Sequence, residues 1–159
     1  MTILTPELDL ARTLRYNYIF RGLSRDVVAG IAALADTRHY RGGDVIVRQY
    51  EHNSDLIIIL DGSARIKSVD EETIAEFGPG SVVGEIALVD DEPRSATVTA
   101  VGDVTAAIIP SKSLHAVMDM DPEVGKVIMT NLARVLCRRM RSMNAHQQES
   151  HAPRHKHAR

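Results

Sequence analysis

The stretch from Asp36 to about Pro110 constrains the fold more than any other part of the chain. It consists of short runs of alternating apolar and β-branched residues, which turn residues interrupt every several positions. The pattern predicts strands at residues 37–40, 45–48, 56–61, 63–69, 73–77, 96–100 and 104–110, and the turns between them include Asp61-Gly62 and Gly102-Asp103. Many short strands in one unit are typical of an antiparallel β-roll or jelly roll.

Helical patterns flank this stretch on both sides. Ser24 is a suitable N-cap for a helix over residues 25–35, and Ser111 for a short helix that ends near Met118. A longer helix is predicted over residues 122–146, because Pro122 suits a first helical position and apolar residues follow at spacings of three and four. Four arginines are expected to lie largely off this apolar stripe: Arg134, Arg138, Arg139 and Arg141.

The expected fold is therefore mainly β, with an N-terminal helical bundle and C-terminal helices around the β-roll. A length of 159 residues fits one domain with a helical appendage. We divide it into a helical segment at 1–35, the roll at 36–110, C-terminal helices at 111–146 and a disordered basic tail at 147–159.

Composition narrows the class of protein. A net charge of -2 makes DNA an unexpected partner, and a single cysteine excludes an internal disulfide. No run approaches the roughly 20 apolar residues of a membrane span, and the N-terminus lacks the long apolar run of a secretory signal. These features predict a cytoplasmic protein.

The segment from Gly84 to Thr97 carries the chemistry. Glu85 and Arg94 lie nine positions apart, with a glycine before the acid and small residues after the base. A guanidinium can hold a phosphate through two parallel hydrogen bonds, and an ionised carboxylate accepts from a hydroxyl. Gly84 allows a close approach of the backbone. The segment therefore predicts a ligand that carries both an anionic group and a free hydroxyl.

The same segment resembles the phosphate-binding cassette of the cyclic nucleotide-binding domain family, which includes the catabolite activator protein and the regulatory subunits of protein kinase A. The resemblance rests on Gly84-Glu85, Ala87-Leu88 and the run from Pro93 to Val98. It implies that Arg94 binds the cyclic phosphate and Glu85 the ribose 2'-hydroxyl, and that without ligand Glu85 is a candidate partner of Arg94. The expected ligand-binding residues are Val83, Gly84, Glu85, Ile86, Ala87, Arg94, Ser95 and Ala96.

The choice of base is less determined by the sequence. In the family the residue after the arginine often differs between adenine and guanine binders, and Ser95 matches the catabolite activator protein. The resemblance thus favours cyclic AMP over cyclic GMP. Predicted base contacts are Val47, Ile58, Val83 and Ala96, and either Asn131 or Arg134 could reach the base edge from the last helix.

The helix over residues 122–146 is expected to transmit the signal. In the family it covers the base as a lid or forms a dimer seam, and packing only on its own roll is the third alternative. We expect a sensor whose ligand repositions this helix and so alters an interaction with an unknown downstream protein, with a homodimer through the helix as one possibility. Since only a short polar tail follows, a DNA-binding domain is not expected, and the chain resembles a stand-alone bacterial module.

Two other functions compete with this one. The first is a structural or interaction module that keeps the fold without a ligand. The second is a small metal-dependent enzyme of the cupin type, which the scattered positions of His39, His52 and His115 disfavour. No motif for a nucleophile, a zinc site or a phosphate loop is present, so neither catalysis nor a cofactor or metal is expected. The tail histidines fit metal binding, contact with an acidic partner or a nucleic acid, or solvation: His146, His151, His155 and His157.

Overall fold

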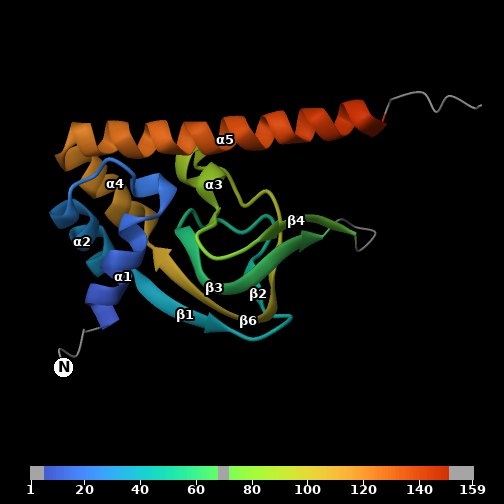
Figure 1. The fold of residues 1–159 in the computed structure, drawn as a ribbon, viewed down its shortest axis with the longest axis horizontal. Coiled ribbons are helices and arrows are strands. Elements are labelled where there is room, and N and C mark those ends of the chain that lie inside the picture. Colours follow the sequence, from blue (N-terminus) through green and yellow to red (C-terminus); the bar gives the residue numbers. More distant parts are fainter. Residues whose placement is uncertain (1–5, 68–71, 151–159) are drawn as a thin grey trace, which may run out of the picture.

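A computed structural model describes residues 6–67 and 72–150 of the chain (Figure 1). Helices gather on one side of the β-sheet, and the last helix runs along the top of the view and continues past the strands (Figure 1). The helical elements are α1 (Pro6–Arg15), the 3-10 helix η1 (Tyr18–Phe20), α2 (Arg25–Leu34), α3 (Glu85–Asp90), α4 (Ser111–Met120) and α5 (Pro122–Ser150).

The strands form one antiparallel sheet, as the sequence predicted. They are β1 (Asp36–Tyr40), β2 (Val45–Val47), β3 (Leu56–Lys67), β4 (Thr73–Phe77), β5 (Val82–Val83) and β6 (Val98–Ile109). The strand order is β1-β6-β3-β4, with β2 on β6 and β5 on β3. Because β6 pairs with three strands, it holds the roll together.

Two predicted turns are wrong. Asp61-Gly62 lies inside β3 and Gly102-Asp103 lies inside β6, so each of these strands replaces two shorter predicted ones. Gly62 has a φ of +82°, and the pairing of β3 with β6 shifts register around Asp61. An irregularity of this kind bends a strand without ending it. The turn residues therefore curve the long strands into a roll.

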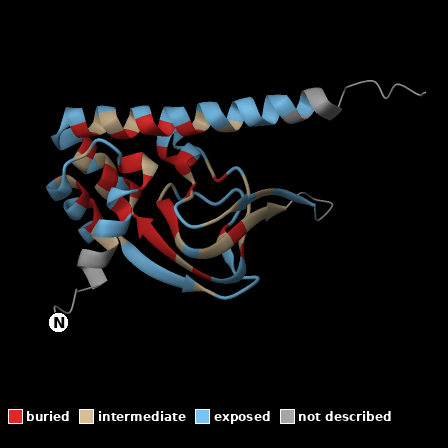
Figure 2. Ribbon diagram, viewed as in Figure 1, coloured by how far each residue is buried: buried red, intermediate tan, exposed pale blue. Residues whose placement is uncertain are grey.

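The sheet separates two apolar cores, and alternation along β3 supplies both of them. Leu56 and Ile58 pack with α1, α2, α4 and α5, whereas Ile57 and Ile59 pack inside the roll. Side chains of a strand point alternately to its two faces, which explains this division. Figure 2 shows the buried residues concentrated along the contact between helices and sheet and along the inner strands.

The helix ends agree with the sequence in part. The Ser24 hydroxyl accepts a hydrogen bond from the amide of Val27, as expected of an N-cap. Ser111 does not cap α4, because it is the first residue of that helix and its amide donates to the Asp55 carboxylate at 3.0 Å.

The last helix ends later than the sequence suggested. α5 continues through Ser150, beyond the predicted boundary at residue 146. The side chain of His146 and the residues His151, His155 and His157 lie outside what the structure describes. Within the described ranges, no helix is long and apolar enough to cross a membrane.

Candidate functional site

The start of α3 brings the backbone unusually close to an arginine. Gly84 has a φ of +83°, a left-handed conformation that glycine adopts without strain. The Arg94 guanidinium lies so close to Gly84 that a β-carbon would collide with its Nη1 atom. The conformation therefore favours glycine at this position, and any larger residue would also displace the Arg94 guanidinium.

Arg94 is buried inside the roll, with 4% of its surface exposed. Its guanidinium donates to the carbonyl of Gly84 at 3.1 Å, to the carbonyl of Asp55 at 2.7 Å and to the Asn53 side-chain oxygen at 3.2 Å. Burial lowers the pKa of Arg94 from its ordinary value, and the charges of Asp55 and Glu51 oppose that shift. The three hydrogen-bond acceptors are all neutral, so the guanidinium is stabilised by polar groups and not by an anion in direct contact.

Glu85 is even more buried, with 1% of its surface exposed. It forms an ion pair with Arg139 of α5, and Arg139 also donates to the carbonyl of Val82 at 2.8 Å. The same guanidinium lies 5.5 Å from the centre of the Phe77 ring. Burial lowers the pKa of Arg139 as well, against a smaller opposing effect of Tyr18. The expected pairing of Glu85 with Arg94 is thus wrong, because α5 supplies the partner.

A small cavity joins the two buried charges. Its volume is about 90 Å³, and Glu85, Arg94, Phe77 and Arg139 all contribute to its wall. Pockets that hold small molecules usually measure about 300 Å³ or more. The cavity is therefore smaller than such pockets, and Arg139 forms part of its wall.

A family model matches the part of the chain that contains most of this cavity. The model of the cyclic nucleotide-binding domain matches residues 37–121, which comprise most of the roll, the α3 segment and α4. The chain belongs to the cyclic nucleotide-binding domain family. Glutaminase 2 of Bradyrhizobium diazoefficiens is 32% identical over 123 residues, which cover 77% of this chain and 20% of that protein.

Two solved structures of the family also resemble this chain. The regulatory domain of Toxoplasma gondii PKA, crystallised with cAMP, has a TM-score of 0.69 and 26% identity, and the match covers 80% of this chain and 50% of that one. The catabolite activator protein of Thermus thermophilus has a TM-score of 0.69 and 27% identity, with coverages of 82% and 62%. The chain therefore spans only part of each of these relatives.

Most of the predicted ligand-binding residues surround the same cavity in this cyclic nucleotide-binding domain. Its wall includes Val83, Gly84, Glu85, Ile86, Arg94, Ser95 and Ala96. The remaining one, Ala87, is buried in α3 and is not part of the wall. The residues before and after the loop of the cassette thus converge although nine positions separate the two charged groups.

The residues predicted to contact the base do not all lie at this cavity. Val47, Val83 and Ala96 line the cavity, but Ile58 belongs to the core on the helical side of the sheet. Asn131 does not reach the cavity, because its side-chain nitrogen donates to the carbonyls of Ile19 and Arg21 at 3.0 and 2.9 Å. Arg134 faces a different cavity.

Sequence reasoning missed Arg139 and Phe77. Arg139 was expected off the apolar stripe, yet it follows Val135 by four residues and Leu132 by seven, and both of these are buried. Residues at these spacings share one face of a helix, so the spacing indicates the buried side of α5 but not the partner of Arg139. Among the residues that the structure describes, no group of three or more His, Cys, Asp or Glu side chains is placed to hold a metal ion.

Proposed function

We propose that this chain is a cyclic nucleotide sensor in which cyclic AMP is favoured over cyclic GMP. Arg94 binds the cyclic phosphate, and Glu85 accepts a hydrogen bond from the ribose 2'-hydroxyl. The neighbouring residues Val83, Gly84, Ile86, Ser95 and Ala96 surround the ligand, and Ala87 supports them from within α3.

The environment of Arg94 carries this proposal. A guanidinium that is almost entirely buried needs an anion or several acceptors to offset its loss of hydration. Among the described residues no carboxylate forms an ion pair with Arg94, and its acceptors are two carbonyls and one amide oxygen. A cyclic phosphate in the adjoining cavity would supply the missing negative charge through short charge-assisted hydrogen bonds.

The pair of Glu85 with Arg139 supports a movement of α5. A ribose hydroxyl that donates to Glu85 competes with Arg139 for the same carboxylate, and the cavity of about 90 Å³ has to expand. We therefore propose that ligand binding displaces Arg139 and with it the second half of α5. The interaction that changes is that of α5 with a downstream protein or a second copy of the chain.

A second copy is favoured by one edge of α5. Met129, Ala133, Leu136, Met140 and Met143 repeat at spacings of four and three, which is the spacing of a coiled-coil seam. Met140 and Met143 are 64% and 65% exposed, although both are apolar. This edge is the homodimer seam that we propose for the helix.

The preference for cyclic AMP rests on Ser95, whose residue type matches the catabolite activator protein, and on the relative crystallised with cAMP. Contacts between this chain and the base decide which of the two nucleotides binds more tightly.

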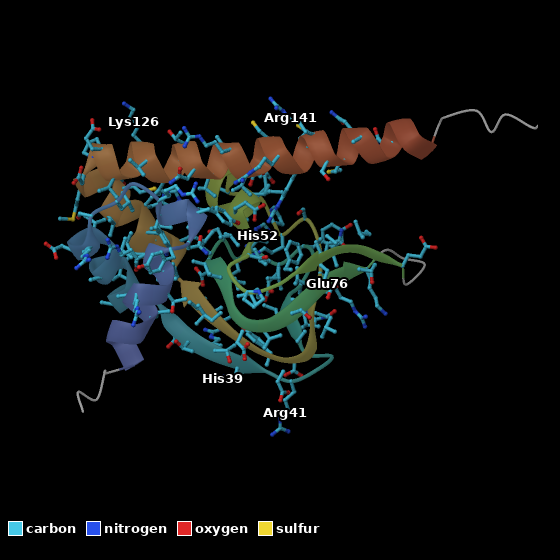
Figure 3. All side chains as sticks on the ribbon, in the orientation of Figure 1. His39, Arg41, His52, Glu76, Lys126 and Arg141 are labelled. Atoms are coloured by element: carbon cyan, nitrogen blue, oxygen red, sulfur yellow. The ribbon has the colours of Figure 1, made fainter. Side chains whose placement is uncertain are left out.

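Calorimetric titration with cyclic AMP, cyclic GMP and 2'-deoxy cyclic AMP tests the sensor. We expect cyclic AMP to bind most tightly, and Arg94→Gln to abolish binding of all three. Glu85→Gln should weaken the binding of cyclic AMP but have little effect on the binding of the 2'-deoxy analogue, because that analogue has no 2'-hydroxyl that could donate to Glu85. Arg41→Gln makes the same substitution at an exposed arginine on the opposite side of the roll from α5 and serves as the control for a general loss of positive charge (Figure 3).

The alternative is a module that keeps the fold but binds no nucleotide. Absence of heat and of any thermal shift with millimolar ligand, in protein whose circular dichroism shows it folded, would favour that alternative over the sensor.

A further inference from the structure

A cavity separate from the cassette lies between η1 and α5. Its volume is about 560 Å³, and η1 and the residue after it contribute Tyr18 and Arg21 to its wall. The rest of the wall comes from α5 between Thr130 and Arg141. We call this cavity the arginine groove, because Arg21, Arg134, Arg138 and Arg141 line it.

No acidic residue lines the arginine groove. In the described part of the chain none of its four arginines forms an ion pair. Arg138 lies over the Tyr18 ring at 5.8 Å, and Arg134 has a weak contact of 3.5 Å with the side-chain oxygen of Asn131. All four arginines are exposed. On a chain whose net charge is -2, the groove is therefore a local concentration of uncompensated positive charge.

We propose that the arginine groove binds an acidic, extended segment of a partner protein. The rise of an α-helix places Arg134 and Arg138 about 6 Å apart along the axis, and Arg138 and Arg141 about 4.5 Å apart. Alternate side chains of an extended peptide are about 6.6 Å apart on one face. Carboxylates at two alternate positions of such a segment can thus meet the guanidinium groups of Arg134 and Arg138, which suits the planar geometry of arginine.

The groove is too long for one small anion. A neighbouring cavity of about 720 Å³ shares Tyr18, Arg21 and Arg138 with it and continues along the end of α1 and the segment from Pro79 to Ser81. A single phosphate would therefore leave most of the space in these two adjacent cavities empty.

A nucleic acid fits less well than a peptide. Single strands gain much of their affinity by stacking bases on open aromatic rings. The aromatic residue of the arginine groove is Tyr18, and the Arg138 guanidinium already covers a face of its ring. Within the arginine groove itself, stacking of a base on Tyr18 therefore has to compete with Arg138.

The groove is distinct from the proposed nucleotide site. None of its four arginines lines the cassette cavity, in which Arg139 is the residue from α5. Arg139 also lines the neighbouring cavity, but the peptide is measured without nucleotide and the test variants leave Arg139 unchanged, so a failure of peptide binding and a failure of nucleotide binding are distinguishable.

Fluorescence anisotropy with a labelled peptide of alternating glutamate and serine, about ten residues long, tests the proposal at low salt. Such a peptide spans roughly 33 Å when extended. We expect it to bind, and the matched peptide of glutamine and serine to bind far more weakly. Two lost charge pairs correspond to a loss of affinity of about tenfold, which is expected for the double variant Arg134→Gln/Arg141→Gln.

Arg21→Gln is the second variant, because Arg21 comes from outside α5 and its loss leaves the helix unchanged. It should weaken the glutamate peptide by a few-fold. The control variant Arg41→Gln/Arg48→Gln removes two exposed charges elsewhere and should bind as the wild type does. Circular dichroism establishes that each variant is folded.

Three results overturn the proposal. These are no binding of the glutamate peptide to folded wild-type protein, an equal loss of affinity in the control variant, and tighter binding of an oligothymidylate than of the peptide. The second result would mean that the whole surface charge attracts the peptide, and the third that the partner is a nucleic acid.

Discussion

Replacing Arg139 by methionine separates two roles that this residue could have at the nucleotide site. Methionine keeps much of the length and removes the charge, so Glu85 loses its partner while the cavity wall remains filled. If Arg139 competes with the ligand for Glu85, the variant should be less stable without nucleotide and should bind cyclic AMP more tightly.

The size of the effect follows from the burial of the pair. Removing one member of a buried ion pair costs about 3 to 5 kcal/mol, because the other charge is left without compensation. Glu85 is 1% exposed, but the Arg139 side chain is 36% exposed and water screens part of the interaction. We therefore expect a loss of about 2 kcal/mol in the free energy of unfolding. For a chain of this size that corresponds to a fall in melting temperature of about 4 to 8 °C.

The same free energy should return in the binding measurement. The wild type gives up the ion pair when the ribose hydroxyl takes Glu85, whereas the variant has no pair to give up. A difference of about 2 kcal/mol corresponds to roughly thirtyfold tighter binding of cyclic AMP. The analogue without a 2'-hydroxyl should gain little, since it cannot satisfy the carboxylate.

Differential scanning calorimetry and isothermal titration supply the two numbers. Lys126→Met removes an exposed charge at the other end of α5 and should change neither, and Arg139→Lys should restore most of the wild-type behaviour (Figure 3). The reasoning is refuted if Arg139→Met is destabilised as expected but binds cyclic AMP more weakly than the wild type. Arg139 would then hold the ligand and would not compete with it.

Two further predictions concern the backbone of the site and the edge of α5. Gly84→Ala should lower the free energy of unfolding, measured by urea titration, by about 2 kcal/mol or more, because its φ of +83° is strained for alanine and a β-carbon collides with Arg94. The control variant Gly30→Ala, at an open position in α2, should instead raise the free energy of unfolding by about 0.5 to 1 kcal/mol. We expect sedimentation velocity to show a dimer of the wild type, and the double variant Met140→Lys/Met143→Lys to be monomeric. A monomeric wild type would show that the proposed seam is wrong.

The local chemistry of the cassette was predictable from the sequence because it is contiguous. Gly84, Glu85, Arg94 and Ser95 lie in one stretch, and their types and spacing indicate an anion with a nearby hydroxyl. The antiparallel roll was predictable for a similar reason, since alternation is a local property of each strand. The lengths of β3 and β6 were not, because a glycine that bends a strand and one that ends it are the same residue in a local window.

The sequence also did not indicate which residues contact each other over long distances in the chain. The partner of Glu85 is 54 residues away on α5, and which arginine of that helix faces the roll depends on its register against η1 and the sheet. Asn131 fixes this register by donating to two carbonyls at and just after η1, contacts that no sequence motif indicates. Arg134, three residues after Asn131, lies beside it, whereas Arg139 shares the buried face of Leu132 and Val135, which precede it by seven and four residues.

The two charges of the proposed site connect to the two C-terminal helices by different paths. Arg94 donates to the carbonyl of Asp55, whose carboxylate accepts from the first amide of α4 at 3.0 Å. Glu85 pairs directly with α5. A phosphate that draws Arg94 away from Asp55 would loosen the start of α4, and a hydroxyl that takes Glu85 would free the middle of α5.

Since α4 leads directly into α5, a ligand that carries both groups acts on the helical pair at two points, whereas inorganic phosphate or a nucleoside acts at only one. The movement of α5 should therefore require the intact cyclic nucleotide, and hydrogen exchange of the α4 and α5 amides with cyclic AMP, phosphate and adenosine in turn would reveal whether either half alone is sufficient.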